Sequence, residues 1–319
     1  MQLADRGAAS FVVQSMKQFL RCSDIQQQGC LLLSKLCIPK ELAQQCCLLV
    51  MKSMEAFPDT AQLQKSACQA IEVLWRPGAQ QQFLLTLGVV DAIKVLMERH
   101  TEHALQMVAL NTLHTLLTRT VQQQRVEWND AQELAAMRSL LGAVERNNEF
   151  QNDQNLESNH HHLQSRAWHA ILVALNRGNG TSHFFACGGA ATICKTLPAF
   201  IGQRSQIPSG LFRDKEKRLR LQTAAMAVFR VVCTDRHEWR HVRRGDADLI
   251  LEAMSIDLPS SGLIKNCCGA LGGLAVQPQW HEWLNGAGAA TQALHALQAL
   301  RVREFYEDDS ETAAACAAG

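Results

Sequence analysis

The feature that most constrains this chain is a segment that recurs along it with the same apolar spacing. Ser15–Leu36 and Ser53–Leu74 align without a gap at an offset of 38 residues. The matched apolar pairs are Met16 with Met54, Phe19 with Phe57, Ile25 with Leu63, and Leu33 with Ile71. A chain that repeats one apolar pattern is expected to fold by stacking copies of one structural unit.

The same pattern continues toward the C-terminus. Four copies open with the dipeptide Leu-Gln, at Leu63-Gln64, Leu105-Gln106, Leu163-Gln164 and Leu221-Gln222. Within a copy the apolar residues follow the i, i+4, i+7 spacing of a helix with one buried stripe. The small residue that anchors each copy is Gly29, Ala67, Ala109, Ala167, Ala225 or Cys267, at separations of 38, 42, 58, 58 and 42. These separations predict a unit of about 40 residues.

A second helix is expected before each of these long helices, opening at a glycine. The candidate turn glycines are Gly7, Gly88, Gly189, Gly245 and Gly288. A left-handed backbone between two helices is accessible to glycine at little cost. A short helix such as Gln80–Gly88 comes before the turn, so the expected unit is short helix, glycine turn, helix, loop and long helix.

The two separations of 58 leave about 16 extra residues in each of two units. The first insertion spans 144–162 and is rich in Asn, Gln and His; the second spans 200–218 and contains Pro208-Ser209-Gly210 before a charge run. We expect both to form loops between the second and third helices of their units.

A three-helix unit of about 42 residues with a glycine before its second helix resembles the armadillo repeat. The resemblance covers nearly all of 1–319, as a single array of about six full repeats plus partial units at both ends. It implies an all-α, right-handed solenoid that binds partners along a groove lined by the third helices. Both chain ends look cut, which favours as an alternative an armadillo module or fragment of a larger signalling protein.

Charge and cysteine content limit the kinds of partner and the cellular compartment that we expect for this protein. Hydrophobic residues make up 47% and charged residues 19%, with a net charge of +1, so we expect a packed chain with no general affinity for nucleic acid or membranes. Ten Lys/Arg against four Asp/Glu lie in Arg213–Arg244, which we interpret as a solvated face rather than a phosphate-binding surface. The twelve cysteines include no C-x-x-C, and no apolar leader or long apolar run occurs. We expect reduced, buried thiols, no membrane span, and a cytoplasmic location with the nucleus possible.

A literal H-E-x-x-H occurs at His237, Glu238 and His241. On an α-helix this spacing places two imidazoles on one face, where they bind zinc with the glutamate as general base. However, the tripeptide His-Glu-Trp recurs at residues 281–283 in the next unit, so the repeat explains it without a metal. Arg240 also lies between the two histidines and would oppose a dication. A zinc-dependent hydrolase is therefore kept only as a distant alternative.

The expected groove can be compared with that of related proteins. Armadillo proteins that read basic import peptides carry a ladder of Trp and Asn on their third helices. Here the Trp positions hold Leu31, Gln69, Asn111, His169, Ala227 and Gly269, so that ladder is absent. The polar side chains on this face are expected to contact a partner, and they are Lys35, Gln69, Asn111, His169 and Arg230.

The sequence thus predicts a non-catalytic scaffold. We expect a rigid concave surface that binds a partner protein or peptide, with no cofactor, no metal and no small-molecule substrate.

Overall fold

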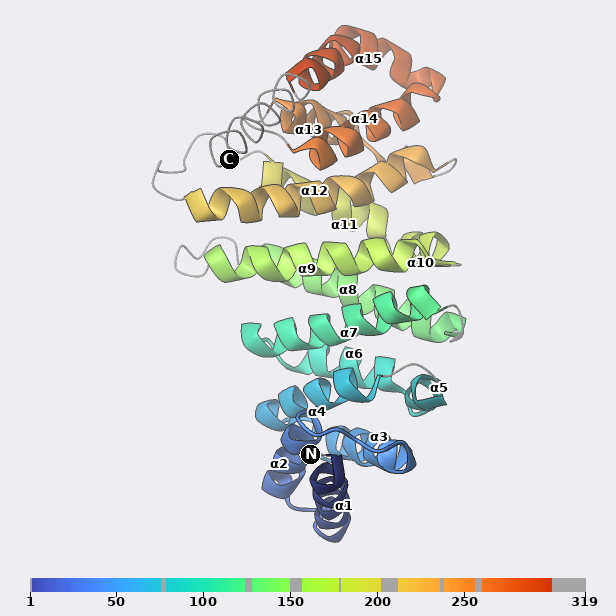
Figure 1. The fold of residues 1–319 in the computed structure, drawn as a ribbon. Coiled ribbons are helices and arrows are strands. Elements are labelled where there is room, and N and C mark those ends of the chain that lie inside the picture. The colour runs from blue at the N-terminus through green and yellow to red at the C-terminus, as the bar shows by residue number, and fades with distance from the viewer. Residues whose placement is uncertain are drawn as a thin grey trace, which may run out of the picture. The chain divides into compact units, whose positions relative to one another are not determined.

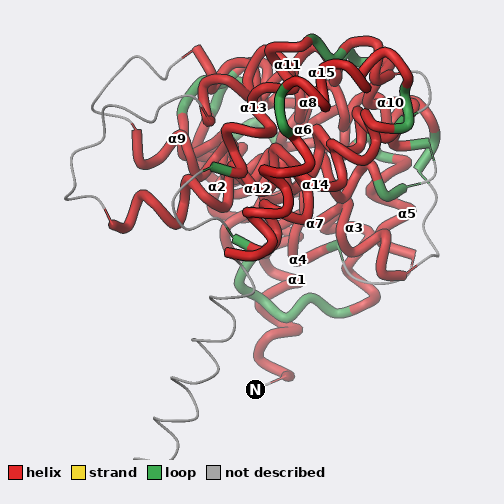
Figure 2. Tube along the Cα trace, turned by 90° about the horizontal axis from the view of Figure 1, so that it is seen from above, coloured by secondary structure: helices red, strands yellow, loops and turns green. Residues whose placement is uncertain are grey.

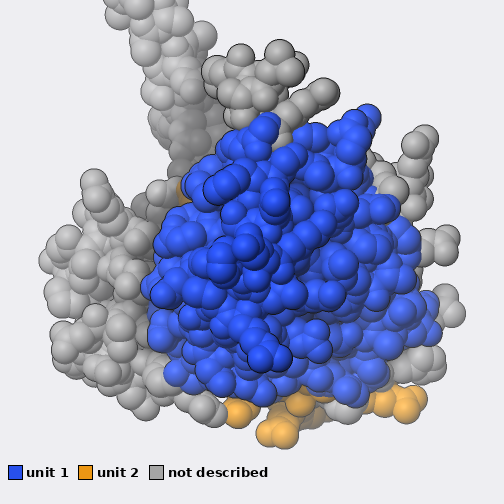
Figure 3. Space-filling view, turned by 90° about the horizontal axis from the view of Figure 1, so that it is seen from below, with its two compact units in different colours: residues 1–187 blue, residues 188–319 orange. Residues whose placement is uncertain are grey.

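The computed structural model of the chain describes residues 2–75, 79–123, 128–149, 157–177, 179–201, 212–235, 238–255 and 260–299. Helices dominate these residues and no strand occurs among them (Figure 2). The prediction of an all-α fold is confirmed. The chain divides into two compact units, Met1–Cys187 and Gly188–Gly319 (Figure 3), and each is described separately below.

The described part of the first unit consists of helices of 7 to 21 residues. They are α1 (Gln2–Gln18), α2 (Ser23–Leu33), α3 (Lys40–Ala56), α4 (Ala61–Leu74), α5 (Ala79–Thr86), α6 (Val89–Arg99), α7 (His103–Gln123), α8 (Asp130–Glu149), α9 (Glu157–Leu175) and α10 (Gly180–Ala186). The helices predicted from the Leu-Gln register are α4, α7 and α9. In this unit α2 packs against α4, α4 against α7, and α7 against α9, while α6 and α8 lie behind them (Figure 1).

The apolar stripe predicted from the sequence forms the core of this stack. On α4 the buried residues include Leu63, Ala67, Ile71 and Leu74, and the equivalent residues of α7 and α9 are buried in the same way. The small anchor residue Ala67 is fully buried. A small side chain at this position lets neighbouring helices approach closely.

The recurring glutamine has a structural role that the apolar pattern does not reveal. In three successive copies its buried side-chain amide donates two hydrogen bonds to carbonyls at the end of the preceding helix. Gln26 donates to Met16 and Phe19 at 2.8 and 2.9 Å, Gln64 to Met54 and Phe57 at 2.9 and 3.0 Å, and Gln106 to Met97 at 2.7 Å and to His100. The last carbonyls of a helix have no partner within it, so each glutamine satisfies buried acceptors that the helix leaves open.

The second unit contains α11 (Gly189–Ile201), α12 (Phe212–Thr234), the 3₁₀ helix η2 (Glu238–His241), α13 (Arg244–Met254), α14 (Ser261–Ala275), η3 (Pro278–Trp280) and α15 (His281–Gly286), followed by helical residues 289–299. Here α12 packs against α14, and α11 packs against both α12 and α13. A Cβ added to Gly273 of α14 would lie 2.6 Å from the carbonyl oxygen of Cys233. The absence of a side chain at Gly273 therefore permits the close approach of α14 to α12.

Several local predictions need correction. Gly88 and Gly288 do adopt left-handed turns, with φ of 77° and 63°, but the third such glycine is Gly188 and not Gly189. Gly7 lies inside α1 and Gly245 inside α13, so neither marks a turn. In addition, residues 34–39 between α2 and α3 hold no short helix, so that unit has two helices and not three.

The predicted loops at 144–162 and 200–218 are also wrong wherever the structure describes these segments. Helix α8 continues to Glu149 and α9 already begins at Glu157, while α11 continues to Ile201 and α12 begins at Phe212. Each added residue of an existing helix gains a backbone hydrogen bond without a new nucleation step, so the extra residues extend the flanking helices. Residues 150–156 and 202–211 lie outside the described part of the chain.

Candidate functional site

A polar groove opens on the first unit where the long helices lie side by side. Its cavity volume is about 590 Å³. The lining residues are Ser34, Lys35, Gln69, Glu72, Val73 and Arg119. They come from the turn after α2, from α4 and from α7, so three successive long-helix segments build one surface.

Helix α4 supplies the floor of this groove. Gln69, Glu72 and Val73 are spaced three and four residues apart, which places them on one face of the helix. All three are half-buried, whereas Ala70, Ile71 and Leu74 face the core. The amphipathic pattern that buries one side of α4 therefore determines which residues remain on the other.

Glu72 is held in place by α7. One of its carboxylate oxygens accepts a hydrogen bond of 2.8 Å from the hydroxyl of Thr112. Burial raises the pKa of the Glu72 carboxyl, and the Thr112 hydrogen bond and the charges of Arg119 and Arg166 act in the opposite direction. The carboxylate is thus engaged within the protein.

Arg119 reaches from α7 to the C-terminal end of α4. Its Nη1 donates to the carbonyl oxygens of Glu72 and Trp75 at 3.2 and 3.1 Å. A cation at this end of a helix is stabilised by the helix dipole and satisfies carbonyls without an intrahelical partner. The guanidinium is therefore fixed in orientation although the residue is exposed.

Lys35 lies on the other side of the groove, directly after α2. It is exposed, and its neighbour Ser34 closes the helix by donating a hydrogen bond to the carbonyl of Leu31 at 2.7 Å. The ion pairs found in the described part of the chain include neither Lys35 nor Arg119. Two cationic side chains thus line the groove, together with the Glu72 carboxylate, which interacts electrostatically with Arg119.

The polar surface continues from α7 to α9. Burial lowers the pKa of His114 on α7, and the charges of Arg166 and His169 on α9 lower it further. Asn111, also on α7, keeps its side-chain oxygen buried without a hydrogen-bond partner. His169 is exposed, and its Nδ1 lies 2.7 Å from the carbonyl oxygen of Ser165.

The structure gathers some of the predicted contact residues in the first unit, and another belongs to the second unit. Lys35 and Gln69 line the same groove. Asn111 and His169 are on the neighbouring helices α7 and α9. Arg230 belongs to α12 in the second unit, where its side chain occupies the space beside Gly269 of α14. Whether any of these residues binds a partner remains a prediction.

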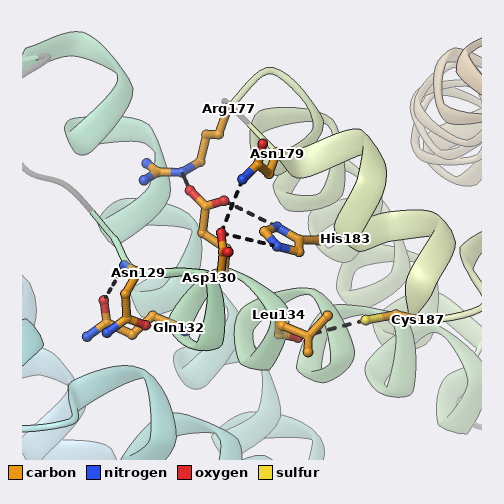
Figure 4. A network of polar contacts seen from close by, with 9 residues as sticks. Asn129, Asp130, Gln132, Leu134, Arg177, Asn179, His183 and Cys187 are labelled. Atoms are coloured by element: carbon orange, nitrogen blue, oxygen red, sulfur yellow. Dashed lines mark hydrogen bonds and ion pairs between the residues drawn. The ribbon is translucent and has the colours of Figure 1, made fainter.

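A second polar cluster joins the start of α8 to α10 and to the residues just before α10 (Figure 4). Glu133 pairs with Arg177 through an Nε–Oε1 distance of 3.3 Å, and its other oxygen lies 3.2 Å from Nδ1 of His183. Asp130 accepts a hydrogen bond of 3.1 Å from the side chain of Asn179 and lies 3.7 Å from Nε2 of His183. The Arg177 guanidinium also stacks on a tryptophan ring at 4.8 Å.

Asp130, Glu133 and His183 are the three described residues whose ligand atoms come close enough to hold one metal ion. However, Arg177 occupies one oxygen of Glu133 inside this cluster and brings a positive charge that opposes a dication. Burial lowers the pKa of Arg177, and the Glu133 carboxylate counteracts that effect. The arrangement is a largely buried ion pair that ties α8 to the residues preceding α10.

The H-E-x-x-H segment does not have the geometry of a zinc helix where it is described. Helix α12 ends at Thr234, and Glu238–His241 form a 3₁₀ helix. With three residues per turn, positions four apart are about 120° apart around the axis. His237 lies outside the described residues.

The sequence did not predict Glu72 and Arg119 in the groove, nor the buried Thr112 that bonds to Glu72. Glu72 interrupts the apolar run Ile71–Leu74, which is a signal that this position faces away from the core. Arg119 offers no such signal, because it meets the carbonyl of Glu72 across 47 residues of sequence. The cluster of Asp130, Glu133 and Arg177 likewise depends on contacts between helices.

Comparisons with known proteins identify no relatives. No family model matches the chain, and no curated protein matches it. A solved structure titled "Crystal Structure of Engineered Protein" is 13% identical to this chain, with a TM-score of 0.48. The match covers 84% of this chain and 97% of the engineered protein, and this similarity supports no conclusion about the chain. None of the described helices combines the length and apolar character needed to cross a membrane.

Proposed function

We propose that this chain is a non-catalytic scaffold of the armadillo type, a right-handed solenoid that binds a partner protein or peptide along the exposed face of its long helices. The observation that carries the proposal is the groove of about 590 Å³ at Lys35 and Gln69, two residues expected on that face. Stacked helices with a common buried stripe hold such a surface in advance, which lowers the entropic cost of binding.

The state of the cysteines supports a reducing compartment, the cytoplasm or the nucleus. The cysteines in the described part of the chain are all free thiols, and most are buried or half-buried, although Cys37 is exposed. Burial raises the pKa of Cys30 and of Cys68 to about 12, which makes these thiols unreactive packing residues rather than nucleophiles or metal ligands.

The test is quantitative capture of partners from an extract of the native cell. The parent chain is compared with Gln69→Trp, which fills the groove with a large side chain. The matched control is Gln44→Trp, on the exposed side of α3 and away from the groove. We expect the parent and the control to retain the same partner and Gln69→Trp to lose it. Retention of that partner by Gln69→Trp would contradict binding at this surface.

A further inference from the structure

The charges in the groove indicate which kind of partner segment fits it. Lys35 and Arg119 lie on two sides of the cavity, and the one carboxylate among the lining residues, Glu72, is already bonded to Thr112. Neither cation takes part in an ion pair in the described part of the chain. The lining residues therefore carry two cations against the single carboxylate of Glu72, whose charge acts on Arg119, and this leaves a net charge of +1.

Arg119 is arranged to bind a carboxylate. Its Nη1 is directed at the carbonyls of Glu72 and Trp75, which fixes the plane of the guanidinium. A guanidinium has five N–H donors, so those of Nε and Nη2 remain for a ligand. Two parallel N–H donors match the two oxygens of a carboxylate, and a fixed fork loses less entropy on binding than a mobile one.

The remaining lining residues suit an extended backbone. Gln69 is half-buried on α4, the helix that packs against both α2 and α7, and its side-chain amide takes part in none of the hydrogen bonds found in the described part of the chain. A primary amide can donate to a peptide carbonyl and accept from a peptide N–H at the same time. The volume of about 590 Å³ exceeds the space that a single small anion would fill.

Positive charge also continues beyond the cavity along the direction in which the helices stack. Arg166 on α9 is exposed and acts electrostatically on both Glu72 and His114. Burial lowers the pKa of His114, and the charges of Arg166 and His169 lower it further, so the charged form of this histidine is disfavoured. A segment that runs from α2 toward α9 would therefore pass Lys35, Arg119 and Arg166 in turn.

We propose that this groove binds an extended, acidic segment of the partner protein, with carboxylate side chains set against Lys35 and Arg119. The proposal rests on the proposed function and specifies the chemistry of the partner at that same surface.

The experiment uses the full chain and three sets of synthetic peptides of roughly a dozen residues, matched in length and apolar content, in which the variable positions carry Glu, Gln or Lys. We expect the Glu set to bind about tenfold more tightly than the Gln set, with an affinity that falls as salt rises, and the Lys set to bind least.

Variants then locate the binding. Lys35→Glu should weaken the Glu set by about tenfold, since it removes an attraction and adds a repulsion. Arg119→Lys keeps the charge but loses the paired donors, so it should weaken binding to a smaller extent. Lys40→Glu, an equally exposed change on α3, is the control and should have no effect. Circular dichroism confirms that each variant is folded.

Equal binding of the Glu and Gln sets, or equal effects of Lys35→Glu and Lys40→Glu, would refute the acidic partner. An oligonucleotide that displaces the Glu peptides at lower concentration would refute it in favour of a nucleic acid. If the peptides show no charge preference but Gln69→Trp still loses the captured partner, the proposed function stands and only this inference fails.

Discussion

Replacing Gln64 by methionine should destabilise the first unit, whereas the same change at Gln164 should not. Both glutamines follow a leucine at equivalent positions of the repeated pattern, and both are buried, at 2% and 0% exposure. Methionine has a similar length and volume, so the substitution leaves little cavity. The two variants therefore differ mainly in the hydrogen bonds that are lost.

At Gln64 the loss follows from the structure. The amide donates to the carbonyls of Met54 and Phe57 at 2.9 and 3.0 Å. In a continuing helix the Met54 carbonyl would accept a hydrogen bond from the backbone N–H of residue 58, but residue 58 is proline and has no N–H. Without Gln64 the Met54 carbonyl is therefore left buried without a donor. Phe57 keeps a bond of 3.2 Å from the N–H of Thr60. An unsatisfied buried acceptor costs about 1–3 kcal/mol and a lost bond about 0.5–1.5 kcal/mol, which gives roughly 2–4 kcal/mol in all.

At Gln164 the expectation is reversed. Both polar atoms of this side chain are buried without a partner. The preceding helix α8 extends to Glu149, and carbonyls inside a continuous helix are already bonded to amides four residues on, so they do not offer acceptors as Met54 and Phe57 do. Methionine removes a polar group that was desolvated without compensation, so Gln164→Met should be neutral or stabilising by about 1–2 kcal/mol.

Hydrogen exchange followed by mass spectrometry is the suitable measurement, because stacked helical units can open locally and need not unfold in one step. We expect faster exchange in α3 and α4 for Gln64→Met, and unchanged or slower exchange in α8 and α9 for Gln164→Met. Gln44→Met, on the exposed side of α3, controls for the loss of an amide in solvent. Equal acceleration in the Gln64 and Gln164 variants would show that the capping bonds do not explain the recurring glutamine.

Three further predictions concern charge and thiol chemistry. Glu133→Leu should lower the free energy of unfolding by about 3–5 kcal/mol in urea titrations, since it leaves the largely buried Arg177 unpaired. Adding Arg177→Met to this variant should recover part of the loss. A double variant that is less stable than Glu133→Leu alone would contradict the prediction. Because the pKa of Glu72 is higher in the folded chain than in the unfolded chain, the folded state binds the proton more tightly. The free energy of unfolding should therefore decline as the pH rises from the ordinary carboxyl pKa to the raised pKa of the folded state. Glu72→Gln should abolish this decline, and parallel pH profiles of the parent and the variant would refute the prediction. At pH 8 a thiol with a pKa of about 12 is ionised to about one part in ten thousand, so Cys37→Ser should remove one fast-reacting thiol in a thiol titration and Cys30→Ser should remove none.

Local sequence spacing predicted which side of the repeated long helices is buried. The spacing of Leu63, Ala67 and Ile71 predicts the buried face of α4, because side chains three and four residues apart share one side of a helix whatever lies opposite. The glycine turns at Gly88 and Gly288 followed from local backbone preferences in the same way. These features depend on neighbours close in sequence.

Tertiary structure decided whatever depends on contacts between helices. Nothing in the Leu-Gln motif indicates that Gln64 caps α3, or that the side chain of Gln164 has no hydrogen-bond partner in the described part of the chain. The polar run at 144–162 suggested a loop, yet the adjoining parts of α8 and α9 continue as helix. Arg119 joins the groove only because α7 packs against α4 and brings the guanidinium to carbonyls more than forty residues away in the chain. Local spacing fixes which side of a helix is apolar, but the partners of polar groups are set by packing.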